Sequence, residues 1–243
     1  MQVLAIAGSL RTGSYNRQLA EAARAVVRRI RPDIGFAILD WGDVSPMNQD
    51  VEHPAPAAVR RVRDSVRTSD GLWVFSPEYN HAIPGPFKNL LDWLSRPEEP
   101  TRPSVLARKP IALAGASTGM SGASHAQDQL IGVLSFLDAR VMNKPRLAIP
   151  HVTSQAKDGV LRLTTSASRL EAQAEAFVWF VENAREHDEG WHPRTPTRSF
   201  RAQAAQNVPE RTGRRITRLM QREKDDHRQP LASDAASPIL SPL

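Results

Sequence analysis

The chain has 243 residues, of which 40% are hydrophobic and 24% charged, and this predicts a globular protein with one large domain, or one domain and an appendage. It contains no cysteine, so disulfides and thiolate metal sites are excluded. No apolar stretch reaches the roughly 18 residues of a membrane-spanning helix, and the first residues lack the basic region of a signal peptide, so we expect a cytoplasmic protein that does not enter a membrane.

The net charge of +6 is concentrated in the C-terminal part of the chain. Residues 1–193 hold 22 Lys and Arg against 21 Asp and Glu, whereas residues 194–243 hold 10 against 5. The nearly neutral body argues for neither a nucleic-acid-binding nor a membrane-binding surface. Residues 191–243 lose the hydrophobic periodicity and are predicted to form a basic, mostly disordered extension. A nucleic-acid-binding arm is the less favoured interpretation of this extension.

Five short apolar runs alternate with helical patterns along residues 1–190. The runs lie at residues 2–8, 35–40, 71–76, 109–117 and 139–149. Lys144-Pro145 interrupts the last run. Each run is followed by apolar residues at helical spacing, in the segments 19–30, 59–66, 87–94, 130–137 and 170–181. Near-continuous apolar strands joined through helices predict a doubly wound parallel sheet with helices on both faces.

Ligands of a doubly wound sheet bind beyond the carboxyl ends of its strands. We therefore expect the functional site in the loops that follow the first, third and fourth strands, at residues 8–16, 76–86 and 115–123. The first of these loops, "GSLRTGSYN", leads into a helix, whose N-terminal N–H groups favour an anion. Arg11 adds a permanent cation, and short polar side chains add donors: Ser9, Thr12, Ser14 and Asn16.

Two familiar nucleotide-binding motifs do not fit this first loop. A P-loop requires lysine where Ser14 stands, and a dinucleotide fingerprint requires glycine where Leu10 stands. An ordinary turn with an N-cap at Ser14 or Asn16 is the structural alternative. The number of donors favours a phosphate-binding loop.

The second loop, "SPEYNHAIPGP", contains Pro77, Pro84 and Pro86, which restrict the backbone and present the residues between them to a flat polar ligand. The third loop, "GASTGMSGAS", contains three glycines and four hydroxyl-bearing residues. It is suited to donate backbone N–H groups to carbonyl oxygens or to a developing anion. A phosphate-binding loop beside two loops that present polar groups to a flat ligand is typical of a site for flavin mononucleotide (FMN).

The segments "GSLRTGSYNRQLA", "PEYNHAIPGPFKNLLDWLSRP" and "LDARVMNKP" resemble the NAD(P)H-dependent FMN reductases of the flavodoxin-like superfamily, which include quinone, azo-dye and chromate reductases. The resemblance covers roughly residues 2–186. It implies a flavodoxin-like, three-layer domain over residues 1–190, with five parallel strands in the order 2-1-3-4-5. It also implies FMN as cofactor, NADPH or NADH as co-substrate, a small-molecule electron acceptor, and a homodimer or homotetramer.

The resemblance also assigns cofactor-binding residues. The phosphate positions correspond to Ser9, Arg11, Ser14, Tyr15 and Asn16. The segment along the flavin ring corresponds to Pro77, Glu78, Tyr79 and Asn80, and the loop at the pyrimidine side to Ser117 and Gly119. One departure is that Ser124 follows Gly122-Ala123, where many members carry an arginine.

The implied reaction passes a hydride from the nicotinamide to FMN and then to a quinone, azo, chromate or free-flavin acceptor, by ping-pong turnover. The backbone near Ser117 and Gly119 is expected to stabilise negative charge on the ring. No catalytic acid or base is required, and His81 is more simply an exposed loop residue than a proton donor. No spacing of His, Asp and Glu is typical of a metal site. The alternative function is an FMN-binding electron carrier or redox sensor whose basic extension recruits a partner.

Overall fold

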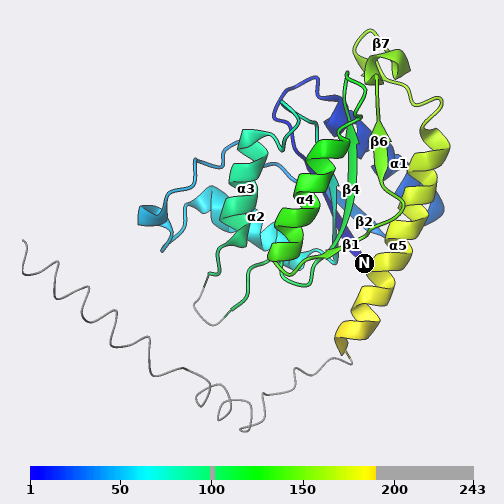
Figure 1. Ribbon diagram of the computed structural model, residues 1–243. Helices are drawn as coiled ribbons and strands as arrows, with labels where there is room; N and C mark the ends of the chain where they lie inside the picture. Colours follow the sequence, from blue (N-terminus) through cyan, green and yellow to red (C-terminus); the bar gives the residue numbers. More distant parts are fainter. Residues whose placement is uncertain (99–101, 190–243) are drawn as a thin grey trace, which may run out of the picture. The chain divides into compact units, whose positions relative to one another are not determined.

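A parallel β-sheet runs through the part of the chain that the computed structural model describes, residues 1–98 and 102–189, with side chains up to residue 184 (Figure 1). The extension predicted at residues 191–243 lies outside the described residues. The strands are β1 (Gln2–Ala7), β2 (Gly35–Ile38), β3 (Gly71–Phe75), β4 (Pro110–Ala116), β5 (Arg140–Val141) and β6 (Leu147–Ile149). Their order is β2-β1-β3-β4-β5, and β6 also pairs with β4.

The edge of the sheet beside β4 is formed by two short strands, β5 and β6. The first half of β4 pairs with β5, and its second half pairs with β6, both in parallel. The two strands are therefore one interrupted fifth strand, and the break lies at Lys144-Pro145, as predicted. The flavodoxin-like order 2-1-3-4-5 is confirmed.

Helices cover both faces of this sheet (Figure 1). One face packs against α1 (Tyr15–Ile30) and α5 (Ala167–Glu189), and the other against α2 (Ala57–Thr68), α3 (Gly85–Ser95) and α4 (Ser124–Phe136). Every residue of β3 and β4 is buried, because both of their faces are covered. This two-sided burial is why these strands read as continuous apolar runs rather than as alternating patterns.

Three short elements were not predicted from the sequence. They are two 3₁₀ helices, η1 (Gln49–Val51) and η2 (Val152–Gln155), and a hairpin of β7 (Ala156–Lys157) and β8 (Val160–Leu161). All are too short to leave a periodic pattern. The helix η2 follows β6 and so stands at the carboxyl edge of the sheet.

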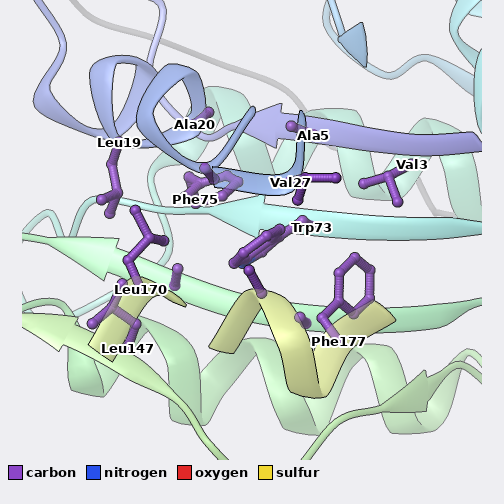
Figure 2. Packing of buried hydrophobic residues seen from close by; sticks show 14 of the residues in the cluster. Val3, Ala5, Leu19, Ala20, Val27, Trp73, Phe75, Leu147, Leu170 and Phe177 are labelled. Atoms are coloured by element: carbon purple, nitrogen blue, oxygen red, sulfur yellow. The ribbon is translucent and has the colours of Figure 1, made fainter. Parts of the chain in front are cut away.

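Trp73 of β3 lies at the centre of the core between the sheet and α5 (Figure 2). Its ring centroid lies 5.2 Å from that of Phe75 and 5.3 Å from that of Phe177. Its indole Nε1 donates a hydrogen bond of 3.2 Å to Oε1 of Gln173. The Gln173 amide in turn donates to the backbone oxygen of Leu113, at 2.8 Å. This chain of contacts fixes α5 on the sheet.

Glu52, a buried carboxylate, forms a bidentate ion pair with Arg96 at the end of α3. The Arg96 Nε and Nη2 donate to the two carboxylate oxygens at 2.8 and 3.1 Å. These hydrogen bonds lower the pKa of Glu52 below its ordinary value. Because the folded-state pKa is depressed, the pair stabilises the protein above the ordinary carboxyl pKa, and this contribution is lost as the pH falls through the lowered value.

Glu52→Gln is therefore expected to lower the free energy of unfolding by about 1–2 kcal/mol at pH 7, since a charge-assisted pair is replaced by a neutral one. The difference from wild type should shrink between pH 7 and pH 3, because the wild-type carboxyl binds a proton progressively as the pH falls below its ordinary pKa and through the lowered folded-state value. Urea denaturation at both pH values measures it. Asp43→Asn, which breaks an exposed ion pair with Arg61, is the control and should change little. A deficit that is the same at both pH values contradicts the prediction.

Candidate active site

Two adjoining cavities lie at the carboxyl edge of the sheet, where the loops after β1, β3, β4 and β6 meet. The first has a volume of about 400 Å³ and the second of about 560 Å³. Both are within the range of small-molecule sites. The first is lined by Ser9, Arg11, Ser14, Tyr15, Asn16, Pro77, Glu78, Tyr79, Ala116, Ser117, Thr118, Val152 and Thr153. The second is lined by Glu78, Asn80, His81, Ser117, Gly119, Met120, Ser121 and His125.

All eleven residues that the sequence analysis assigned to the cofactor line one of these two cavities. They come from three loops that are far apart along the chain, and the parallel sheet brings these loops to one edge. The two cavities share Glu78 and Ser117, so they form adjoining parts of one site. What each side chain does there differs in several cases from the expectation.

The N-terminus of α1 forms one wall of the first cavity. Ser14 is its N-cap, and the Ser14 hydroxyl accepts a hydrogen bond of 3.3 Å from the N–H of Arg17. The first turn contains no acidic residue. Arg11 donates to the backbone oxygen of Gly13 at 2.6 Å, and its guanidinium lies 5.8 Å from the centre of the Tyr15 ring. A helix N-terminus with a fixed arginine beside it suits a phosphate group.

Asn16 is buried, and both ends of its amide are bonded to Ala116. The Asn16 Nδ2 donates to the Ala116 oxygen, and the Ala116 N–H donates to Asn16 Oδ1, both at 2.9 Å. The side chain therefore ties the start of α1 to the end of β4. We expected the Asn16 side chain to donate to the phosphate, but in the structure its amide positions the wall of the cavity.

The second loop makes a tight turn that the prolines alone do not explain. Tyr79 and Ala82 exchange two backbone hydrogen bonds, of 3.1 and 2.9 Å. Between them Asn80 and His81 have φ angles of 52° and 60°, the pattern of a two-residue type I′ turn. The Tyr79 hydroxyl lies 3.5 Å from the hydroxyl of Ser9 in the first loop. The turn thus places Tyr79 at the rim of the first cavity.

The Glu78 carboxylate points to the start of α4. Its Oε2 accepts from the N–H of His125 at 3.0 Å, and its Oε1 accepts from the Ser121 hydroxyl at 2.8 Å. Burial opposes ionisation of this group, but the hydrogen bonds from His125, Ser121 and Ala126 outweigh it and lower the pKa of Glu78. Glu78 therefore holds the second loop against the third and caps α4.

The third loop is bonded to the loop after β6. The N–H of Ser117 donates to the oxygen of Ile149 at 3.1 Å, and the N–H of Val152 donates to the oxygen of Ser117 at 2.9 Å. The N–H of Gly119 is bonded to the Ser117 hydroxyl at 3.1 Å. The two N–H groups that we expected to stabilise charge on the ring are thus already bonded within the protein.

Val152 and Thr153, which line the first cavity, were not predicted from the sequence. The rule that ligands bind beyond the carboxyl ends of strands applies to β6 as well, and it would have found them. We also expected no metal site, because no spacing of His, Asp and Glu along the chain is typical of one. In the structure, the ligand atoms of Glu78, His81 and His125 all lie within 4.8 Å of one another.

Comparison with known proteins identifies the family. The sequence pattern of the NADPH-dependent FMN reductases matches residues 1–154. The chain belongs to this family. This confirms the resemblance noted in the sequence, and the family implies an oxidoreductase with FMN as cofactor and NAD(P)H as co-substrate. Among the described residues, no helix is long and apolar enough to span a membrane.

Individual relatives of this FMN reductase cover most of its described residues. A 2-hydroxy-1,4-benzoquinone reductase of Burkholderia sp. is 37% identical over 155 residues, 64% of this chain and 81% of the relative. An NAD(P)H-dependent FMN reductase of Pseudomonas aeruginosa is 36% identical over 188 residues, 76% of this chain and 97% of the relative. A solved flavoenzyme NAD(P)H:acceptor oxidoreductase from Paracoccus denitrificans has a TM-score of 0.66 and 32% identity, and the match covers 75% of this chain and 98% of that one.

The residues present in this FMN reductase fit the cofactor. The α1 N-terminus and Arg11 provide a cationic end for the phosphate. The rest of the first cavity is lined by short polar side chains, by Tyr79 and by apolar groups, which suits a flat ring with polar edges. Glu78 is the one acidic residue among those lining the first cavity. Its carboxylate accepts hydrogen bonds from the Ser121 hydroxyl and the His125 N–H at the start of α4, which stabilise its negative charge.

Proposed function

We propose that the chain is an NAD(P)H-dependent quinone reductase that works through bound FMN by ping-pong turnover. FMN, when bound, supplies the redox chemistry, taking a hydride from the nicotinamide and handing two electrons to the acceptor. The observation that carries the proposal is the pair of adjoining cavities, one with an anion-binding end and one open beside it. The names of relatives, such as the quinone reductase of Escherichia coli, support a quinone as acceptor.

The residues of the chain have two tasks in this proposal. Arg11 and the start of α1 hold the phosphate, and the Tyr79 turn and the loop at Ser117 hold the ring between them. The second cavity, of about 560 Å³, adjoins the first and is the proposed place of the nicotinamide and, after it has left, of the acceptor. Both would stack on the same exposed face of the ring and would therefore bind in turn, as ping-pong turnover requires. Azo dyes, chromate and free flavin are further acceptors that such a site is proposed to accept.

No side chain needs to act as an acid or a base in this scheme. A quinone receives the two electrons and one proton of the hydride, and a second proton from solvent completes the hydroquinone. The open second cavity admits that solvent.

We also propose that the protein forms a homodimer or homotetramer, which light scattering measures directly.

The absorbance spectrum and steady-state kinetics of the purified protein test this function. The protein is expected to be yellow, or to become so with added FMN, and to oxidise NADPH or NADH faster when 1,4-benzoquinone is present. Double-reciprocal plots at several quinone concentrations should be parallel. A protein that binds FMN but is reduced by neither nucleotide would instead be an electron carrier. A protein that binds no FMN would contradict both the reductase and the carrier function.

Arg11→Gln is expected to weaken FMN binding about tenfold, because it removes one charge-assisted contact with the phosphate, worth roughly 1.5 kcal/mol. Arg11 is exposed, so the fold should be unaffected. Titration of the unloaded protein with FMN, followed by quenching of flavin fluorescence, measures the change. Arg28→Gln makes the same charge change in the last turn of α1 and serves as the control. Equal affinities for the two variants contradict the phosphate assignment.

A further inference from the structure

Three side chains converge at the second cavity, from two loops that are more than forty residues apart. The Nδ1 atoms of His81 and His125 lie 3.2 Å from each other. The Oε1 atom of Glu78 lies 3.1 Å from Nδ1 of His125 and 3.5 Å from Nδ1 of His81. The three atoms thus form a nearly equilateral triangle.

Hydrogen bonding within the triangle accounts poorly for this arrangement. A neutral imidazole carries one proton, and a carboxylate carries none. If Nδ1 of His125 donates to Glu78, its single proton does not also lie on the line to Nδ1 of His81. If both Nδ1 atoms are protonated, they face each other as two donors. A shared cation satisfies all three lone pairs at once.

The dimensions match a tetrahedral metal centre. Zinc binds imidazole nitrogen and carboxylate oxygen at about 2.0–2.1 Å, which places tetrahedral ligand atoms about 3.3 Å apart. The observed separations of 3.1, 3.2 and 3.5 Å lie around this value. Two imidazoles and one carboxylate favour zinc over magnesium or calcium, which prefer ligand sets made only of oxygen.

The groups around the triangle hold its ligands in place. The Glu78 Oε2 is occupied by the N–H of His125, so only Oε1 faces the two imidazoles. The Ser121 hydroxyl donates to that same Oε1 at 2.8 Å and orients it. His81 occupies a positive-φ position of the type I′ turn, which directs its Cα–Cβ bond towards His125 and Glu78. Such outer contacts are typical of metal sites.

We propose that Glu78, His81 and His125 form a binding site for one divalent transition metal ion of the zinc type. The fourth coordination position is open towards the second cavity, where Asn80, Ser117 and Met120 also lie. His81 and His125 are exposed, so the ion reaches the site from solvent. Among the side chains that the structure describes, in residues 1–98 and 102–184, this is the one group of three His, Asp or Glu residues whose ligand atoms converge in this way.

Isothermal titration of the flavin-loaded, full-length protein with zinc chloride tests the site. The variants are His81→Asn, which keeps a residue that tolerates positive φ, and His125→Ala. Each variant is expected to lower the affinity for the one zinc ion bound per chain at this site at least about tenfold. Removing even an outer contact of a metal site lowers the metal affinity about 10–100-fold. The control is His53→Ala, because His53 also lies beside a buried carboxylate, 3.6 Å from Glu52, and should stay within twofold of wild type.

Two outcomes would overturn the proposal. The first is equal zinc stoichiometry and affinity for wild type and for the double variant His81→Asn/His125→Ala. The second is a zinc X-ray absorption spectrum of the loaded wild-type protein without imidazole scattering. Unchanged FMN content and circular dichroism of the variants verify that the fold is intact, and magnesium chloride should produce no binding at this site.

Discussion

Trp73→Ala is expected to lower the free energy of unfolding by about 3–5 kcal/mol, the largest single loss of stability that we predict. The Trp73 side chain is 0% exposed and packs against Phe75 and Phe177 between β3 and α5 (Figure 2). Alanine removes this ring, leaves a cavity in the core, and leaves Oε1 of Gln173 without its donor. Urea denaturation at neutral pH measures the loss.

Two variants separate packing from hydrogen bonding at this position. Trp73→Phe keeps a ring but removes the N–H, so it should lie between wild type and Trp73→Ala. Trp179→Ala is the control, because Trp179 lies on α5, the helix that packs against Trp73, but is 64% exposed. It should change stability by less than about 0.5 kcal/mol. A loss for Trp73→Ala no greater than for Trp179→Ala contradicts the central place of Trp73 in the core.

Gly122→Ala is expected to weaken FMN binding by more than about a hundredfold and to lower stability by about 2 kcal/mol or more. Gly122 has a φ of +59°, and an added Cβ would lie 2.7 Å from the nitrogen of Pro150 and 2.8 Å from the carbonyl carbon of Ile149. These are backbone atoms, so no side-chain rotation relieves the clash. The third loop must shift away from the loop after β6, which displaces the Ser117 side of the site.

FMN titration and urea denaturation measure the two effects. Gly132→Ala is the matched control, because Gly132 is exposed in α4 and an added Cβ meets nothing within 4 Å. It should leave FMN binding unchanged and raise stability by up to about 1 kcal/mol, since alanine favours a helix more than glycine does. Wild-type FMN affinity in Gly122→Ala would show that the third loop does not shape the cofactor site.

Several features of this FMN reductase follow from local patterns in the chain. Two-sided burial makes the central strands continuous apolar runs, and one-sided burial gives the helices their periodicity. The doubly wound parallel sheet and the split fifth strand at Lys144-Pro145 were therefore predictable, whereas the strand order was expected only from the resemblance to the family. The site residues were also predictable as a set, because parallel strands end at one edge and the loops after them carry Arg11, Glu78 and Ser117 to it.

The direction of each side chain within that set depended on partners far away in the sequence. Asn16 bonds to Ala116, 100 residues later, and Glu78 bonds to the N–H of His125, 47 residues later. No local pattern reports such pairs, because only the packed sheet brings their loops together. For the same reason the spacing of histidines along the chain showed no metal site, although the fold places His81 and His125 side by side. Local patterns thus located the active site, whereas contacts across the fold assigned its residues their tasks.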